Sequence, residues 1–165
     1  MYHLIMKLLV LSDSHKNTEY MEAAVRQESP DAVIHLGDHF DDAVALQKKV
    51  PDAVIYMVLG NCDVFSKGKS EILLPIENVR ILLSHGHQHG VKSGLSKLAF
   101  RAVDMGADLV LYGHTHIPDI QELQGITLMN PGQIERHDEY GPASYGIVEV
   151  NDGKFNCNIV YMSSY

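Results

Sequence analysis

Histidine, aspartate and asparagine side chains recur at one kind of position in this sequence, shortly after a run of apolar residues. Five short and mainly apolar runs lead into the segments Asp13-Ser14-His15, Gly37-Asp38, Gly60-Asn61-Cys62-Asp63, His85-Gly86-His87 and Gly113-His114-Thr115-His116. Imidazole nitrogens and the oxygens of carboxylates and amides are metal ligands. The recurrence therefore predicts a metal site assembled from five separate segments of the chain.

The spacing within these segments favours joint binding of a cation. Asp13 and His15 are two residues apart, as are His114 and His116, and side chains two apart in extended chain point to the same side. A set of carboxylates and imidazoles suits Mn²⁺, Fe²⁺, Ni²⁺ or Zn²⁺, whereas Mg²⁺ and Ca²⁺ favour oxygen ligands alone. Asp38 adds a second carboxylate, which can bridge two ions with its two oxygens. The ligand set is large enough for two divalent ions.

Two divalent ions would give this acidic protein a local positive centre. The ions bring +4 and the carboxylates of Asp13 and Asp38 remove two charges, which leaves +2 to attract an anion. Paired metals about 3.5 to 4 Å apart acidify a shared water and stabilise the oxygens that attack and leave phosphorus. We therefore expect hydrolysis of a phosphate ester, with a hydroxide bound to both metals as the nucleophile.

The apolar runs before these segments have the composition of buried β-strands. Short apolar runs are typical of strands covered on both faces, and the loops at the carboxyl ends of such strands carry the chemistry in α/β proteins. The run 53–59 is rich in β-branched residues, as expected of a central strand. The expected strands are 8–11, 32–36, 53–59, 79–83 and 109–112.

Three helices are predicted between these strands from apolar spacing, capping residues and prolines. Their expected boundaries are Asn17 or Thr18 to Pro30, Asp41 to Pro51, and Ser93 or Ser96 to Gly106. The segment 64–70 has no periodicity and is predicted to be a loop.

The last third of the sequence changes to a hairpin pattern. Gln124-Gly125 and Asn151-Asp152-Gly153 are turn signals, each between two segments that resemble strands. The final strand alternates Phe155, Cys157, Ile159 and Tyr161 on one face, so we expect that face to pack inward. The fold class is therefore α/β, with two facing sheets and helices outside.

The composition limits the classes of protein to consider. A chain of 165 residues with 45% hydrophobic content can bury one core, and we expect a single domain over residues 1–165. The net charge of −8 argues against binding to duplex nucleic acid or to an anionic membrane. No segment has the length of a membrane span or the pattern of an export signal, which predicts a cytoplasmic protein. Exposed tyrosines such as Tyr140 and Tyr145 could mediate a homo-oligomer.

The five polar segments, with the second extended to Gly37-Asp38-His39-Phe40-Asp41, resemble the motifs of the calcineurin-like metallophosphoesterases. The likeness covers nearly the whole chain and is to the small bacterial and archaeal phosphodiesterase branch, which also resembles the retromer subunit Vps29. It implies a four-layer αββα sandwich of two mixed β-sheets flanked by helices. It also implies that Asp13, His15 and His116 hold one metal, that Asn61, His85 and His114 hold the other, and that Asp38 bridges them.

One position departs from the wider superfamily. Its usual catalytic histidine directly follows the metal-binding asparagine, where this sequence has Cys62. The small phosphodiesterases of this branch share that cysteine, so the resemblance still implies activity. A thiol with a reference pKa of about 8.5 could protonate the leaving group, and so could His87 or water. Cys62 and His87 are therefore the candidate proton donors.

Three functions are considered for this set of residues. The first is a metal-dependent phosphodiesterase with Mn²⁺ as the favoured ion and a small phosphodiester as substrate. The second is a noncatalytic protein-binding scaffold like Vps29, against which the complete ligand set argues, because a scaffold has no need of seven metal-binding side chains. The third, a nuclease, is disfavoured by the net charge and by the lack of a basic groove with interleaved aromatic residues.

Other polar residues near the five segments have simpler interpretations. His35 lies within a strand and is expected to be a hydrogen-bonded core residue. His39 and His89 are expected at the surface unless they orient metal ligands. Three cations in loops could attract a phosphate, namely Lys16, Lys67 and Arg136.

Overall fold

Two five-stranded sheets form the centre of the structure, a computed structural model that describes residues 4–135 and 139–162. The first sheet contains β1 (Met6–Leu11), β2 (Ala32–His35), β3 (Val54–Met57), β9 (Ser144–Asn151) and β10 (Lys154–Tyr161). The second sheet contains β4 (Glu71–Ile76), β5 (Val79–Ser84), β6 (Leu109–Leu111), β7 (Asp119–Leu123) and β8 (Ile126–Asn130). The helices are α1 (Thr18–Glu28), α2 (Phe40–Lys49), the 3₁₀-helix η1 (His87–His89) and α3 (Ser96–Met105).

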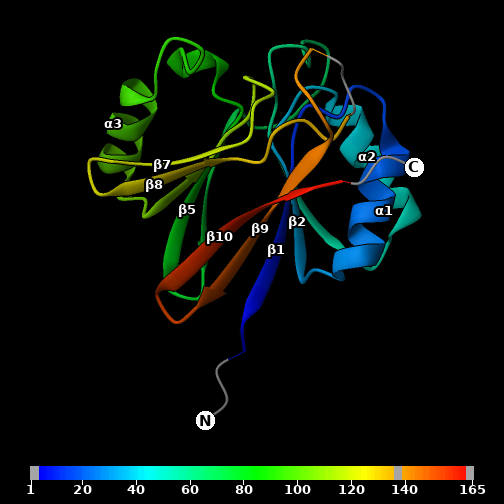
Figure 1. Cartoon of the computed structure of the whole chain (residues 1–165), viewed down its shortest axis with the longest axis horizontal. Coiled ribbons are helices and arrows are strands. Elements are labelled where there is room, and N and C mark those ends of the chain that lie inside the picture. The colour runs from blue at the N-terminus through cyan, green and yellow to red at the C-terminus, as the bar shows by residue number, and fades with distance from the viewer. Residues whose placement is uncertain (1–3, 136–138, 163–165) are drawn as a thin grey trace.

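Both sheets mix parallel and antiparallel pairs. The strand orders are β10-β9-β1-β2-β3 and β4-β5-β6-β8-β7, with parallel pairs β1·β2, β2·β3, β5·β6 and β6·β8. Helices α1 and α2 lie on one side of the sheet pair and α3 lies on the other (Figure 1). The predicted four-layer αββα sandwich is confirmed. None of the described helices is long and apolar enough to cross a membrane.

Strand β1 shows how the alternation of side chains builds the layers. Leu8 and Val10 lie in the apolar cluster between the two sheets, whereas Leu9 and Leu11 belong to the cluster with Met21 of α1. All four strand residues are fully buried. Burying one such side chain stabilises a fold by about 1.5 to 3 kcal/mol, so both faces of β1 fix its place in the sandwich.

Strand β3 differs from the prediction. It is an edge strand that pairs only with β2, and Val54 is 49% exposed, so the expectation of a buried central strand was wrong. The chain leaves β3 and crosses to the second sheet, where β4 begins at Glu71. β-Branched residues suit any pleated and partly buried surface, which is why they did not distinguish the edge from the centre.

The predicted helix ends and turns agree with the structure. Asn17 caps α1 by accepting a hydrogen bond from the Tyr20 backbone N at 3.1 Å, and Gly106 ends α3 in the left-handed region at φ 68°. Both predicted hairpins form, as β7–β8 and β9–β10. In β10, Phe155 packs inward, but Tyr161 is 58% exposed and departs from the expected inward face.

The two tyrosines proposed for self-association have different environments. Tyr145 is only 1% exposed, and its hydroxyl donates to Glu28 Oε1 at 2.8 Å, so it offers no surface to a partner and that prediction was wrong. The residue lies on β9 and packs in the cluster under α1. Tyr140 is 39% exposed.

Candidate metal centre

The five polar segments follow the carboxyl ends of β1, β2, β3, β5 and β6, as predicted. Their backbone is strained. Of the twelve non-glycine residues with positive φ in the described parts of the chain, seven lie in these segments or directly after one: Asp13, His15, Lys16, Asp38, His39, His114 and His116. Such conformations cost about 1 to 3 kcal/mol each and gather at functional sites, where surrounding structure holds them in place.

Two motif glycines allow these loops to approach one another. A Cβ on Gly60 would lie 2.2 Å from Asp38 Oδ1, and a Cβ on Gly113 would lie 2.1 Å from Ser12 Oγ and 2.9 Å from Asp13 Oδ2. Any side chain at either position would displace a carboxylate of the candidate centre. The glycines are therefore required by close packing of the ligand loops.

The first ligand group consists of Asp13, His15 and His116, which each offer one ligand atom within 4.8 Å of the others. Asp13 Oδ2 is occupied, because it accepts hydrogen bonds from Ser12 Oγ at 2.6 Å and from the His114 backbone N at 3.1 Å. Asp13 Oδ1 accepts none, although His116 Nε2 lies 3.3 Å away. One oxygen thus fixes the carboxylate and the other faces the site.

The second group consists of Asp38, His85 and His114, again with one ligand atom each within 4.8 Å. His85 Nδ1 donates to the Leu36 carbonyl at 2.8 Å, which leaves Nε2 directed at the site. That nitrogen lies 3.1 Å from Asn61 Oδ1, 3.2 Å from His114 Nδ1 and 3.5 Å from Asp38 Oδ2. Asn61 therefore joins this group.

The two groups are neighbours. Asp13 Oδ1 of the first lies 3.9 Å from His85 Nε2 of the second. Asp38 Oδ1 accepts a hydrogen bond from the Cys62 backbone N at 2.9 Å, and its Oδ2 is the oxygen near His85. The structure thus brings all seven sequence-predicted ligands to one place. The bridging role of Asp38 stays a prediction.

The residues present fit divalent cations. Asp13 Oδ1 and His15 Nε2 are both buried and neither has a hydrogen-bond partner among the described residues. A buried polar atom without a partner is costly, whereas a bound cation would satisfy both atoms. Asn61 Oδ1, His114 Nδ1 and Asp38 Oδ2 all lie close to His85 Nε2, and a bound cation would accept their lone pairs as well. Mixed carboxylate, imidazole and amide ligands match the coordination chemistry of transition-metal ions.

The electrostatics keep the two carboxylates and His114 in the form that binds a metal. Burial opposes ionisation of Asp13, but His116 and His85 outweigh it and lower the pKa of that carboxyl. The same competition between burial and His85 lowers the pKa of Asp38 well below its usual range. Burial lowers the pKa of His114 to about 4, with help from the charge of His85. Two carboxylates and a neutral imidazole are therefore present at neutral pH.

The candidate proton donors lie on the second group. Partial burial and the neighbouring Asp38 carboxylate raise the pKa of Cys62 to about 11, so this exposed thiol is protonated at neutral pH. The His87 ring centroid lies 5.4 Å from that of His85 and 6.2 Å from that of His114. Burial and then His85 lower the pKa of His87, which favours its neutral form. Of the two candidates, Cys62 is therefore the one that carries a proton to donate at neutral pH.

Lys92 is a residue that the sequence did not single out. The positive charge of Lys92 acts to lower the pKa of both His114 and His116. The largest effect is burial for His114, whose pKa falls, and the Asp13 carboxylate for His116, whose pKa rises. Lys92 is exposed and lines a cavity of about 370 Å³, to which Thr115, between the two histidines, also contributes. It is a loop lysine without a motif, so only the fold could place it here.

The cations that the sequence did single out are less informative. The backbone N of Lys16 donates to Asp42 Oδ2 at 2.6 Å, which gives this residue a structural role. Lys67 is exposed in the loop after Asn61. Arg136 lies outside the described residues.

The other histidines near the site separate into two kinds. His35 is fully buried and hydrogen-bonded to Ser14 and Gly37, as expected of a core residue. The His39 ring lies 5.0 Å from that of His15, at the edge of the first group. His89 instead pairs with Glu71 at 2.6 Å and lies outside the ligand groups.

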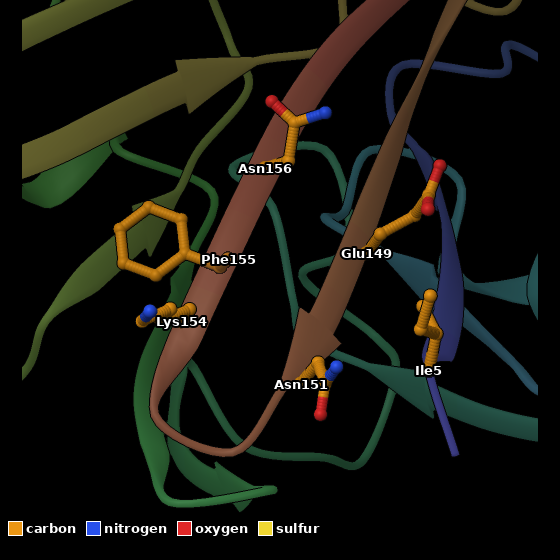
Figure 2. Close-up of a pocket in the computed structure, with 6 residues that line it drawn as sticks. All are labelled: Ile5, Glu149, Asn151, Lys154, Phe155 and Asn156. Carbon is orange, nitrogen blue, oxygen red and sulfur yellow. The ribbon is translucent and has the colours of Figure 1, made fainter. Parts of the chain in front are cut away.

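A second hollow lies at the opposite end of the first sheet and has no part in this centre. Figure 2 shows it at the β9–β10 hairpin, beside the start of β1, whereas Asp13 follows the end of β1. Its volume is about 220 Å³, and it is lined by Ile5, Glu149, Asn151, Lys154, Phe155 and Asn156. It contains no cluster of metal ligands.

Comparison with known proteins agrees with this geometry. The model of the calcineurin-like phosphoesterase superfamily domain matches residues 6–153. The probable metallophosphoesterase YsnB of Bacillus subtilis is 36% identical over 150 residues, which are 89% of this chain and 86% of that protein. The chain therefore belongs to the calcineurin-like phosphoesterase family.

Solved structures show the same fold. A conserved uncharacterized protein from Streptococcus pneumoniae, described as a predicted phosphoesterase, superposes with a TM-score of 0.81 at 26% identity and covers 96% of this chain and 90% of its own. Wild-type Vps29 from Entamoeba histolytica, in complex with Zn²⁺, gives a TM-score of 0.72 at 21% identity over 94% of this chain and 99% of its own. At that identity the likeness to Vps29 concerns the fold alone.

Proposed function

We propose that this protein is a metal-dependent phosphodiesterase with a dinuclear centre. The observation that carries the proposal is the pair of adjacent ligand groups, each with one carboxylate and two imidazoles, at the carboxyl ends of the strands. The metallophosphoesterase family supports phosphoric ester hydrolysis as the reaction. The two groups supply the ligands that two divalent ions need.

The residues of the chain have distinct roles in this proposal. Asp13, His15 and His116 would hold one ion and Asn61, His85 and His114 the other, and Asp38 is proposed as the ligand that both would share. Such ions, when bound, would supply the hydroxide that attacks phosphorus and would neutralise the charge that develops on the phosphate. Lys92 attracts the anionic substrate from its loop. Cys62 or His87 protonates the oxygen of the leaving alcohol.

A diester suits the charge of this centre. Two divalent ions with the carboxylates of Asp13 and Asp38 carry +2, and one hydroxide reduces this to +1, which matches a phosphodiester monoanion. Mn²⁺ is the proposed ion because it accepts both carboxylate oxygens and imidazole nitrogens, as do Fe²⁺, Ni²⁺ and Zn²⁺. A cavity of about 370 Å³ beside Thr115 has the size for a small substrate.

The scaffold alternative rests on the fold shared with Vps29. Two observations argue against a scaffold: buried ligand atoms lack hydrogen-bond partners, and the ligand loops have strained backbone. Both features cost stability, and a protein-binding surface would gain nothing from them. We also propose a cytoplasmic location and no binding to duplex nucleic acid, on the grounds of composition and net charge. Self-association stays a prediction, now without Tyr145.

The test is a hydrolysis assay with a diester and a monoester of the same chromogenic alcohol, on metal-stripped protein supplied with each of Mn²⁺, Ni²⁺, Fe²⁺, Zn²⁺ and Mg²⁺. We expect turnover of the diester to be fastest and to depend on the added metal. Asp38→Ala should lower it at least about 10³-fold, while Asp52→Ala, which removes an exposed carboxylate after α2, should not change it. Unchanged turnover in Asp38→Ala would contradict the proposal, and no turnover with any metal would favour the scaffold.

A further inference from the structure

A buried polar cluster of Ser14, His35 and Asp42 lies beside the first ligand group without belonging to it. Ser14 and His35 are fully buried and Asp42 is 7% exposed. Ser14 Oγ donates to Asp42 Oδ2 at 2.6 Å and lies 3.0 Å from His35 Nε2. The cluster therefore joins the loop after β1 to the end of β2 and to the first turn of α2.

The hydrogen bonds fix the direction of each proton. The Gly37 backbone N donates to His35 Nδ1 at 3.2 Å, so that nitrogen is an acceptor and Nε2 carries the proton that Ser14 Oγ accepts. Burial lowers the pKa of His35 to about 4, which agrees with a neutral ring. Because His35 acts as a donor and Ser14 is inaccessible, the cluster is no nucleophilic triad.

Asp42 holds the loop on both sides of His15, through the side chain of Ser14 and the backbone of Lys16. Its Oδ2 accepts from Ser14 Oγ and also from the Lys16 backbone N, both at 2.6 Å. The loop between them is strained, with φ 45° at His15 and φ 70° at Lys16. Since a left-handed conformation persists only where neighbouring groups enforce it, these two short bonds help to hold His15 in place, together with the turn bonds from the Asn17 backbone N to the Ser14 carbonyl and from the Thr18 backbone N to the Lys16 carbonyl.

We propose that Asp42 is a positioning residue that holds His15 in place for the metal bound by Asp13, His15 and His116. The inference rests on the proposed dinuclear centre, and it adds that the two metal sites depend on different supporting residues. Asp42 contacts the loop of the first group, whereas the second group is fixed by other bonds, such as that from His85 Nδ1 to the Leu36 carbonyl. Loss of Asp42 should therefore weaken one metal site and spare the other.

The experiment is a calorimetric titration of metal-free protein with Mn²⁺. Asp42→Asn removes the charged acceptor at constant size, and we expect it to lower the affinity of one of two binding steps by about 10- to 100-fold, as is typical for partners of metal ligands. The other step should change less than about threefold. Asp41→Asn is the matched control, because it removes the same charge from the same turn of α2 at an exposed position. It should leave both steps unchanged.

Two further variants show which ligand group binds the metal in the weakened step. His114→Ala disables the second group, so adding Asp42→Asn should weaken the step that remains. His116→Ala disables the first group, and adding Asp42→Asn there should have almost no effect. The reverse pattern, or equal weakening of both steps by Asp42→Asn and Asp41→Asn, would overturn the proposal.

A thermal unfolding curve of each metal-free variant separates loss of metal from loss of fold. If Asp42→Asn does not fold, Ser14→Ala replaces it, since this change removes one bond and keeps that from the Lys16 backbone N. It should weaken the same step about tenfold. Wild-type protein that binds no Mn²⁺ would overturn the dinuclear centre and this inference together, whereas two normal steps in both variants would overturn this inference alone.

Discussion

Gly113→Ala should damage the centre without removing any ligand. The added Cβ would lie 2.1 Å from Ser12 Oγ, and ordinary contact begins at 3.4 Å, so these two atoms must separate by about 1.3 Å. Ser12 Oγ cannot yield freely, because it donates to Asp13 Oδ2 at 2.6 Å. The Asp13 carboxylate is itself 2.9 Å from the new atom. The strain therefore passes directly to a proposed metal ligand.

The expected cost has two parts. Overpacking of a close-packed site typically costs about 1 to 3 kcal/mol of unfolding free energy, which urea unfolding would measure. A displacement of about 1 Å at a reacting group costs about 100-fold in rate, so kcat/KM for a diester at saturating Mn²⁺ should fall by about that factor. Loss of activity should therefore exceed what loss of stability explains.

Two companion variants test the reasoning. Gly125→Ala meets no atom within 4 Å and has φ +74°, so it should cost about 1 kcal/mol of backbone energy and leave kcat/KM unchanged. Ser12→Ala combined with Gly113→Ala removes the nearest obstacle and should recover part of the lost activity. Full activity in Gly113→Ala would refute the account of how the loops pack, and so would a double variant as inactive as the single one.

Three further predictions concern side chains around the centre. Lys92→Met should raise KM for an anionic diester about tenfold and change kcat less than threefold; an unchanged KM would show that this cation does not attract substrate. Cys62→Ala should lower kcat about 100-fold for a diester with a poor alkyl leaving group, yet hardly for a nitrophenyl diester, and equal losses on both would exclude proton donation. Burial raises the pKa of Glu71, but hydrogen bonds from His89 and Arg101 outweigh it and lower that pKa below 4.5. Ionised Glu71 thus stabilises the fold above about pH 4.5, and the gap in unfolding free energy between wild type and Glu71→Gln should shrink as the pH falls from 6 to 3; a gap independent of pH would contradict this.

The ligand loops could be predicted from the sequence because each follows an apolar run that only a strand explains. The apolar run of β1 and the turn signal Gln124-Gly125 are local patterns, and local patterns suffice to define elements and hairpins. The resemblance of these segments to the calcineurin-like motifs then predicted which side chains meet. The seven side chains that the resemblance implies as metal ligands lie close together in the structure.

Features set by long-range packing were missed. The edge position of β3 depends on where the chain crosses between sheets, and the burial of Tyr145 depends on α1 lying over β9. Asp42 is an acidic residue in the first turn of a helix, a common position that does not reveal its burial or its bond to the loop after β1. Lys92 carries no motif at all. In each case the decisive partner is distant in sequence.

The central claim is that two metal ions share one centre, and electron paramagnetic resonance of the Mn²⁺-loaded protein tests it most directly. Two Mn²⁺ ions joined by the Asp38 carboxylate would be magnetically coupled, so the account predicts the spectrum of a coupled pair for wild-type protein loaded with two equivalents. Asp38→Ala should lose that coupling. A spectrum of isolated Mn²⁺ at every loading of the wild-type protein would contradict the dinuclear account.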